Sequence, residues 1–245
     1  MAPGGSIAVL GERGAPLTAG RRAGPPQARP DPHGGSIAVL GERGAPLTEW
    51  WTYRLGSFLM FSVRTYDRLV ESYNADLWPL QLPALGLGLV ALVLAWRARS
   101  ALHGRVVAAV LCGAWWWVAW AFHYRRFTAI NWAAEYVAWV FAAQGLALFW
   151  FGVVRARLAS RQAASPVRTL ALVMVVFALL GYPLISVLQG RPWAQAEVFG
   201  VMPDPTAIAT IGFVLLAQAA PRWLLVVPVA ACALSGAMLW TLHVT

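Results

Sequence analysis

Residues 77–96 read LWPLQLPALGLGLVALVLAW, an apolar run that contains no charged side chain. About 20 helical residues, at 1.5 Å each, cross the ~30 Å hydrocarbon core of a bilayer, so this run is long enough to span it. Five further apolar stretches follow, at residues 106–122, 133–154, 170–188, 206–219 and 223–242. Because the runs are continuous and do not alternate with a period of two, they predict helices rather than the strands of a barrel.

The sequence therefore predicts an all-α integral membrane protein, in which residues 76–245 form a bundle of about six transmembrane helices. The stretch 206–219 is shorter than the others. It predicts either a half-helix or a helix that extends into its flanks.

The composition leads to the same fold class. Hydrophobic residues make up 59% of the 245 residues and charged residues 12%, about half of the ~25% charged fraction of ordinary soluble domains. Such a chain lacks the polar side chains that cover a water-soluble fold, and lipid can cover it instead. We expect a multi-pass protein of the inner (plasma) membrane, with the lipid bilayer as its partner and another membrane protein or a second copy of the chain as further candidates.

The net charge of +9 comes from arginine, since the chain contains no lysine. The arginines stand in short groups between the apolar runs, whereas nucleic-acid-binding proteins gather such charges on one face. Nucleic acid is therefore not expected as a partner. By the positive-inside rule, the Arg-rich connections near 97–105 and 155–168 are expected in the cytoplasm, although the arginines of the first 70 residues favour the opposite orientation.

The amino terminus contains a duplication. The sequence GGSIAVLGERGAPLT stands at residues 4–18 and again at 34–48. Its composition predicts disorder over residues 1–48, and we assign no function to that segment. Residues 49–75 mix aromatic and charged side chains, and are expected to form an amphipathic helix in the headgroup region. Its apolar stripe would consist of Phe58, Phe61, Thr65, Leu69 and Tyr73.

Ionisable residues at the ends of membrane helices are candidates for a functional site, because charge is costly within a bilayer. A first cluster, between the second and third predicted spans, consists of His123, Arg125, Arg126, Asn131 and Glu135. Asn131 and Glu135 are four residues apart and would share one face of a helix. Glu135 either stabilises the turn by facing the nearby arginines or handles a proton or cation in a polar cavity.

A second cluster lies between the fourth and fifth predicted spans and contributes Arg191, Gln195 and Glu197. These side chains would line the outer mouth of the same cavity. The alternative is that Arg191 and Glu197 form an ion pair that stabilises the loop. Asp204, next to Pro205, is expected to cap the helix that follows.

The sequence identifies no catalytic residue, cofactor site or metal site. It lacks the glycine-rich phosphate loop and the H-E-x-x-H and G-x-S-x-G motifs. Cys112 and Cys232 lie inside apolar runs and are expected to be buried thiols. An enzymatic function is therefore not favoured, although it stays open.

Several stretches together resemble a known family. They are EWWTYR at 49–54, INWAA at 130–134, GRPWAQAEVFG at 190–200 and PDPT at 203–206. The resemblance is to small bacterial membrane proteins of unknown function, whose members are in some cases labelled MFS transporter permeases, and it covers the chain from about residue 49 to its end. It implies a multi-pass membrane fold and no established activity or catalytic residue.

Three functions are consistent with these features. The leading hypothesis is a membrane protein that handles a small solute or ion across the membrane. The first alternative is a structural or assembly subunit of a membrane complex. The second is a membrane-embedded enzyme acting on lipid or quinone, for which His123 and Glu135 are the candidate acid–base pair.

Overall fold

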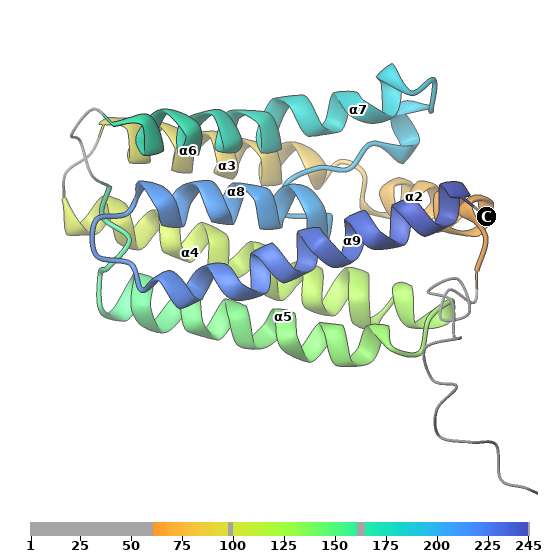
Figure 1. Ribbon diagram of the computed structural model, residues 1–245, viewed down its shortest axis with the longest axis horizontal. Coiled ribbons are helices and arrows are strands. Elements are labelled where there is room, and N and C mark those ends of the chain that lie inside the picture. The colour runs from red at the N-terminus through yellow and green to blue at the C-terminus, as the bar shows by residue number, and fades with distance from the viewer. Residues whose placement is uncertain (1–60, 98–99, 161–164, 245) are drawn as a thin grey trace, which may run out of the picture. The chain divides into compact units, whose positions relative to one another are not determined.

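Helices make up most of the chain that the structure describes. The computed structural model describes residues 61–97, 100–160 and 165–244 (Figure 1). The α-helices are α2 (Val63–Leu77), α3 (Gln81–Arg97), α4 (Ala101–Trp117), α5 (Ala134–Leu148), α6 (Pro166–Val176), α7 (Tyr182–Leu188), α8 (Pro203–Leu216) and α9 (Val226–Val244). π-Helical segments extend α4 and α5 and join α6 to α7, at Val118–Tyr124, Phe149–Val154 and Phe177–Gly181 respectively. Short 3₁₀ turns lie at Phe127–Ala129, Trp193–Gln195 and Arg222–Leu225. Within the three described ranges there is no strand, and an isolated antiparallel bridge joins Ser160 to Ala217.

Four helical segments are long and apolar enough to cross a bilayer: Ala101–Ala129, Ala134–Val154, Pro166–Leu188 and Arg222–Thr241. A fifth crossing is obtained if α2 and α3, which meet at a bend of 87°, form one broken span. The predicted span 206–219 is helical, as α8, but its 14 residues extend only about 21 Å. The predicted helical membrane fold is thus confirmed at the level of four to five helices able to cross, and the count of six is not.

Serine side chains begin three of the helices. The hydroxyls of Ser62, Ser100 and Ser165 accept hydrogen bonds from backbone N–H groups in the first turns of α2, α4 and α6. Each bond satisfies one of the N–H groups that the start of a helix leaves without a partner. In α6 the cap is followed by Pro166, at a position where the missing proline N–H removes no helical bond.

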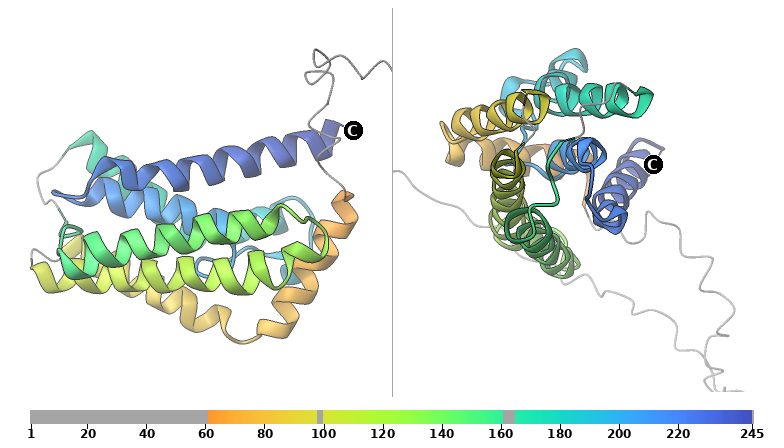
Figure 2. Two further views of the ribbon diagram at one scale, coloured as in Figure 1. Left: turned by 90° about the horizontal axis from the view of Figure 1, so that it is seen from below. Right: turned by 90° about the vertical axis from the view of Figure 1, so that its left-hand side faces the viewer.

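α8 lies inside the bundle. It contacts α4, α6 and α9, and the end-on view in Figure 2 shows it beside these helices. Eleven of its 14 residues are buried. Because protein covers most of α8, its backbone does not have to reach across the hydrocarbon core, and a short apolar stretch is sufficient.

A polar contact joins α8 to α4 in the core. The Trp115 indole N–H donates to the Thr210 hydroxyl at 2.8 Å, and that hydroxyl donates to the Thr206 carbonyl at 2.7 Å. Trp115 also packs against Phe141 of α5, with 4.4 Å between the ring centroids. Trp115 is therefore the point at which α4, α5 and α8 are tied together.

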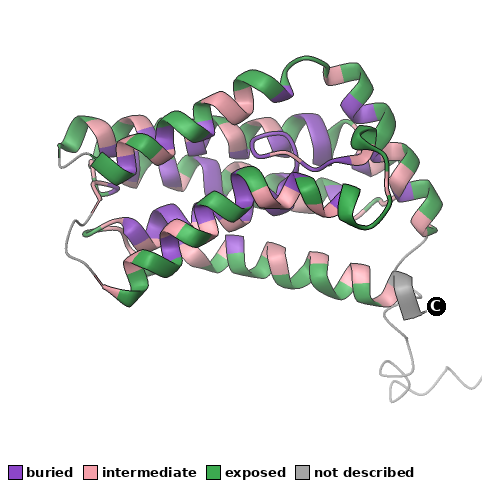
Figure 3. Cartoon of the chain, turned by 90° about the horizontal axis from the view of Figure 1, so that it is seen from above, coloured by how far each residue is buried: buried purple, intermediate pink, exposed green. Residues whose placement is uncertain are grey.

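Large apolar side chains are exposed on the helices. Figure 3, coloured by burial, shows exposed residues along the helices on one side of the bundle. Trp139 of α5 is 67% exposed and Trp240 of α9 is 74% exposed. Extensive exposed apolar surface is unusual for a protein surrounded by water, and it is what a lipid-covered exterior requires. The two cysteines are free thiols; Cys112 is buried as predicted, and Cys232 is half-buried.

α2 is an amphipathic helix, and its packed face agrees in part with the predicted stripe. Of that stripe, Tyr73 is buried, Phe61 and Leu69 are partly buried against the core, and Thr65 is exposed. The other buried residues are Tyr66, Val70 and Asn74, and α2 packs against the chain around Trp193–Gln195. The 87° bend places α2 roughly in the membrane plane if α3 crosses the membrane, so the headgroup location stays a prediction. The predicted disordered segment 1–48 and the first part of 49–75, including Phe58, lie outside the described residues.

Candidate functional site

The chain between α7 and α8 contains no α-helix. We call residues 189–202 the α7–α8 connection, which includes the 3₁₀ turn at Trp193–Gln195. Gly190 and Gly200, near its two ends, have φ angles of 75° and 76°. Few residues other than glycine adopt such angles without strain. The connection thereby turns back from the end of α7 and enters the bundle to reach α8 (Figure 1).

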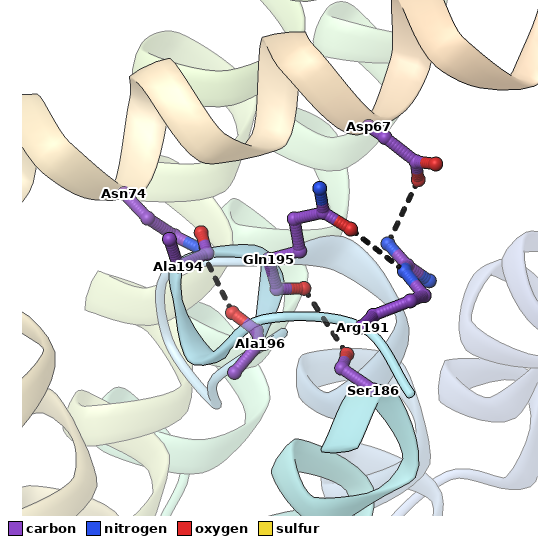
Figure 4. Close-up of polar contacts among 7 residues, drawn as sticks. All are labelled: Asp67, Asn74, Ser186, Arg191, Ala194, Gln195 and Ala196. Atoms are coloured by element: carbon purple, nitrogen blue, oxygen red, sulfur yellow. Dashed lines mark hydrogen bonds and ion pairs between the residues drawn. The ribbon is translucent and has the colours of Figure 1, made fainter. Parts of the chain in front are cut away.

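α2 holds this connection in place. The Asp67 carboxylate forms an ion pair with the Arg191 guanidinium at 2.9 Å (Figure 4). The Asn74 side-chain amide donates to the carbonyl oxygens of Ala194 and Ala196 at 2.8 and 2.9 Å. Because these bonds satisfy backbone groups that have no helical partner, they fix the path of the connection.

The connection is also braced from within. The Arg191 Nε–H donates to Gln195 Oε1 at 3.0 Å, and the Ser186 hydroxyl of α7 donates to the Gln195 carbonyl at 3.1 Å. At its far end, the Tyr73 hydroxyl donates to the Val201 carbonyl at 3.2 Å. Arg191 is therefore held by two partners, Asp67 and Gln195, which position its charge beside the bundle interior.

A polar cavity of about 120 Å³ lies between α2, α7, α9 and the connection. Its walls combine carboxyl, guanidinium, phenol, hydroxyl and amide groups with a few aliphatic side chains. They are Val63, Tyr66, Asp67, Tyr182, Ile185, Ser186, Gln189, Arg191, Glu197 and Leu239. At about 30 Å³ per water molecule, the space suits a few waters or one small polar solute.

Asp204, in the first turn of α8, is a buried carboxyl group with two hydrogen-bond donors. The Tyr182 hydroxyl donates to Oδ2 at 3.0 Å, and the Ser235 hydroxyl of α9 donates to Oδ1 at 2.5 Å. The amino-terminal end of a helix dipole also favours negative charge. These contacts favour the carboxylate form of Asp204, whereas its burial inside the bundle, the larger effect, opposes ionisation.

Glu197, at the cavity wall, is a second buried carboxyl group, and its hydrogen-bonding environment differs from that of Asp204. It is 7% exposed, and its Oε2 atom has no hydrogen-bond partner in the structure. Burial without donors penalises the ionised form, and the nearby charge of Asp204 adds repulsion. Burial first, and then Asp204, raise the pKa of Glu197 to about 8, against the opposing effect of Arg191. Burial and the nearby Asp204 thus favour the protonated form of Glu197.

The structure brings three of the predicted site residues together, namely Arg191, Gln195 and Glu197. The predicted ion pair between Arg191 and Glu197 is wrong, because the Arg191 guanidinium pairs with Asp67. The predicted helix cap at Asp204 is also wrong. The residue that precedes α8 is Met202, and the Asp204 side chain bonds to Tyr182 and Ser235 across the bundle.

The first predicted cluster does not form a site. His123 is buried against the Phe141 ring, 4.4 Å between centroids, and neither ring nitrogen has a hydrogen-bond partner in the described chain. Asn131 precedes α5 and accepts a hydrogen bond from the Ala133 N–H at 3.0 Å, so it does not share a helix face with Glu135. Glu135 is exposed and forms no ion pair with a described residue. His123 is therefore buried and Glu135 exposed, and no hydrogen bond joins the two side chains in the described chain.

The two arginines of that cluster have other contacts. The Arg125 guanidinium lies 5.4 Å from the centroid of the Trp120 ring. Arg126 forms an ion pair with Asp76, near the end of α2. α2 thus contacts both predicted clusters, through Asp76 at one end and Asp67 near the other, but the clusters do not converge on one cavity.

Sequence reasoning did not identify three residues of the site: Tyr66, Asp67 and Ser235. Asp67 lies in a helix that mixes charged and aromatic residues, and Ser235 lies alone in an apolar run, so neither has a local signal. Tyr182, beside Pro183, belongs to the polar stretch that the sequence did single out, and its phenol is the signal, because a buried tyrosine hydroxyl usually has a partner.

Comparisons with known proteins identify a family but no activity. No curated protein and no solved structure matches the chain. Residues 64–244 match the model of a family described as a family of unknown function, DUF6064. This match runs from the first turn of α2 to the end of α9, and so contains every polar residue of the site. It supports neither the permease label nor a bacterial origin, which stay predictions. The chain belongs to DUF6064, a family of unknown function.

Proposed function

We propose that this protein handles a proton at Glu197 and couples it to the movement of a small polar solute or ion through the cavity between α2, α7 and α9. The observation that carries the proposal is the pair of buried carboxyl groups with opposite environments. Asp204 has two donors, and Glu197 has an unpartnered oxygen and lines the cavity. Two titratable groups with such different environments are the usual arrangement in which one stays charged and the other exchanges a proton.

The backbone around the site supports the same proposal. α8 is a short helix that starts inside the bundle, and an irregular connection leads into it. Membrane transporters commonly place binding sites at such interrupted helices, where free backbone groups and helix ends face a cavity. A location in the inner (plasma) membrane belongs to the proposal as well.

Glu197→Gln is expected to remove a pH dependence of stability. A carboxyl group with a pKa near 4.5 in the unfolded chain and about 8 in the folded one binds more protons when folded. Its contribution therefore makes the folded state less stable as pH rises from about 4.5 to about 8. Melting temperatures of the detergent-purified protein between pH 5 and 9 should fall more steeply for the wild type than for Glu197→Gln.

Two further variants make this measurement specific. Glu71→Gln, at an exposed position of α2, should leave the pH dependence of the melting temperature unchanged. Asp204→Asn should shift the fall in melting temperature to lower pH, because the Asp204 charge contributes to the raised pKa of Glu197. An equal pH dependence of the melting temperature for the wild type and Glu197→Gln would remove the basis of the proposal.

If the two pH dependences differ, a transport assay tests the coupling itself. Solute-driven proton movement into vesicles that contain the purified protein is followed with a pH-sensitive dye.

A further inference from the structure

A second groove, which shares no lining residue with the polar cavity, lies on the outward side of α4 and α5. Its volume is about 390 Å³. The walls consist of four aromatic rings and the floor of three alanines: Trp116, Trp120, Tyr124 and Trp139, with Ala119, Ala138 and Ala142. Small residues on both helices leave room for the groove, and the aromatic rings make it apolar.

The shape of this groove is built into the packing of the helices. The Trp116 indole N–H donates to the Ala142 carbonyl at 3.1 Å, which fixes the ring across the two helices. A Cβ atom at Gly145 would lie 2.5 Å from Trp116 Cδ1, so that ring requires glycine beneath it. One wall of the groove is therefore held rigidly and does not depend on a mobile side chain.

The positively charged guanidinium of Arg125 lies at one end of the groove. Arg125 follows Tyr124 directly, and its guanidinium lies over the Trp120 ring, 5.4 Å from the centroid. Arg125 is exposed and forms no ion pair with a described residue, in contrast to Arg126, which pairs with Asp76. The positive charge of Arg125 is thus available to an anion from outside the chain.

The surroundings place this end of the groove at a membrane surface. Arg125 lies where the segment Ala101–Ala129 ends, and the exposed rings of Trp132 and Tyr136 lie at the start of α5 nearby. Tryptophan and tyrosine are enriched at the level of the lipid headgroups. The groove then extends from the headgroup level at Arg125 towards the hydrocarbon core, along α4 and α5.

We propose that this groove is a binding site for an anionic phospholipid. The acyl chain lies between the aromatic rings over Ala119, Ala138 and Ala142, and the headgroup phosphate contacts the Arg125 guanidinium. An arginine binds phosphate oxygens with directed, charge-assisted hydrogen bonds. A headgroup with net negative charge is preferred to a zwitterionic one, because the latter carries its own cation beside the phosphate.

Native mass spectrometry of the full-length protein, with phosphatidylglycerol or phosphatidylcholine added to the detergent solution, tests this site. We expect the wild type to retain phosphatidylglycerol about fivefold more strongly, the effect of one cation near an anionic lipid surface. Arg125→Gln should abolish the preference, and Arg125→Lys should keep most of it. The matched control is Arg155→Gln, at an exposed arginine that directly follows the π-helical extension of α5.

A groove-filling variant tests the position of the acyl chain. Ala142→Phe should reduce retention of both lipids and leave the charge of Arg125 in place. The site is overturned if the wild type retains both lipids equally, or if Arg125→Gln and Arg155→Gln behave alike. A dimer that dissociates on Ala142→Phe would also overturn it, because a second copy of the chain would then occupy the groove.

Discussion

Valine in place of Gly212 is expected to lower the melting temperature of the protein more than any other single glycine replacement proposed for the bundle. Gly212 lies where α8 meets α6. A Cβ atom there would lie 2.5 Å from Val175 Cγ2 and 2.7 Å from the Ala171 carbonyl oxygen. The carbonyl belongs to the backbone of α6, so the helices would have to separate. Overpacking of this kind lowers the free energy of unfolding by about 1–3 kcal/mol. We expect a value at the upper end of that range, because the clash is with a backbone atom.

The matched control for this prediction is Gly86→Val on α3, where a Cβ atom would meet nothing within 4 Å. Both substitutions relieve the conformational cost of glycine in a helix, so their difference reports the contact between helices. The melting temperature in detergent and the yield of monodisperse protein are the measurements. Should Gly212→Val fail to fold, Gly212→Ala offers a smaller obstacle. Equal melting temperatures for Gly212→Ala and Gly86→Ala would contradict the close approach of α6 and α8.

Trp115→Ala is expected to be the most destabilising tryptophan substitution. Trp115 is 0% exposed, and its ring contacts α5 while its N–H bonds to Thr210 of α8. Removing a buried tryptophan leaves a cavity and costs about 3–5 kcal/mol. The substitution also removes the partner of a buried threonine hydroxyl, which adds to the loss.

Trp139→Ala is the matched control, because Trp139 is 67% exposed on α5 and should contribute little to folding. Helical circular dichroism during titration with a denaturing detergent measures both variants without depending on tryptophan fluorescence. Trp115→Phe should be intermediate, since it keeps an aromatic ring and loses the hydrogen bond. A loss of stability for Trp139→Ala as large as for Trp115→Ala would contradict the core position of Trp115.

The helices were predictable because each depends on a continuous local pattern. Most residues of every predicted apolar stretch are helical, and residues 170–188 correspond to Pro166–Leu188, although a π-helical turn interrupts it. Two stretches differ from single spans, because residues 77–96 contain the bend between α2 and α3 and residues 206–219 correspond to the 14-residue helix α8. A run of apolar residues does not distinguish a helix that lipid surrounds from one that other helices surround, so 206–219 resembled a span.

The site was less predictable because its members come from four separate parts of the chain. Glu197 and Arg191 were identified from their polar surroundings, but the sequence did not show that Arg191 bonds to Asp67 and Gln195 or that Asp204 lies near Glu197. The partner of Arg191 lies 124 residues earlier in the sequence (191 minus 67). No local spacing encodes such a pairing. The Asp204–Pro205 sequence suggested a cap because the same residues do begin a helix; only packing against Tyr182 and Ser235 showed where the carboxylate points.

The position of α2 limits how the surrounding segments can move. α2 is linked to the α7–α8 connection through Asp67 and Asn74, and to the turn after α4 through Asp76 and Arg126. Displacing either segment alone requires breaking an ion pair, whereas moving both with α2 preserves every one of these contacts. We therefore expect α2, the α7–α8 connection and the turn after α4 to move together, with α2 as the element that links the other two.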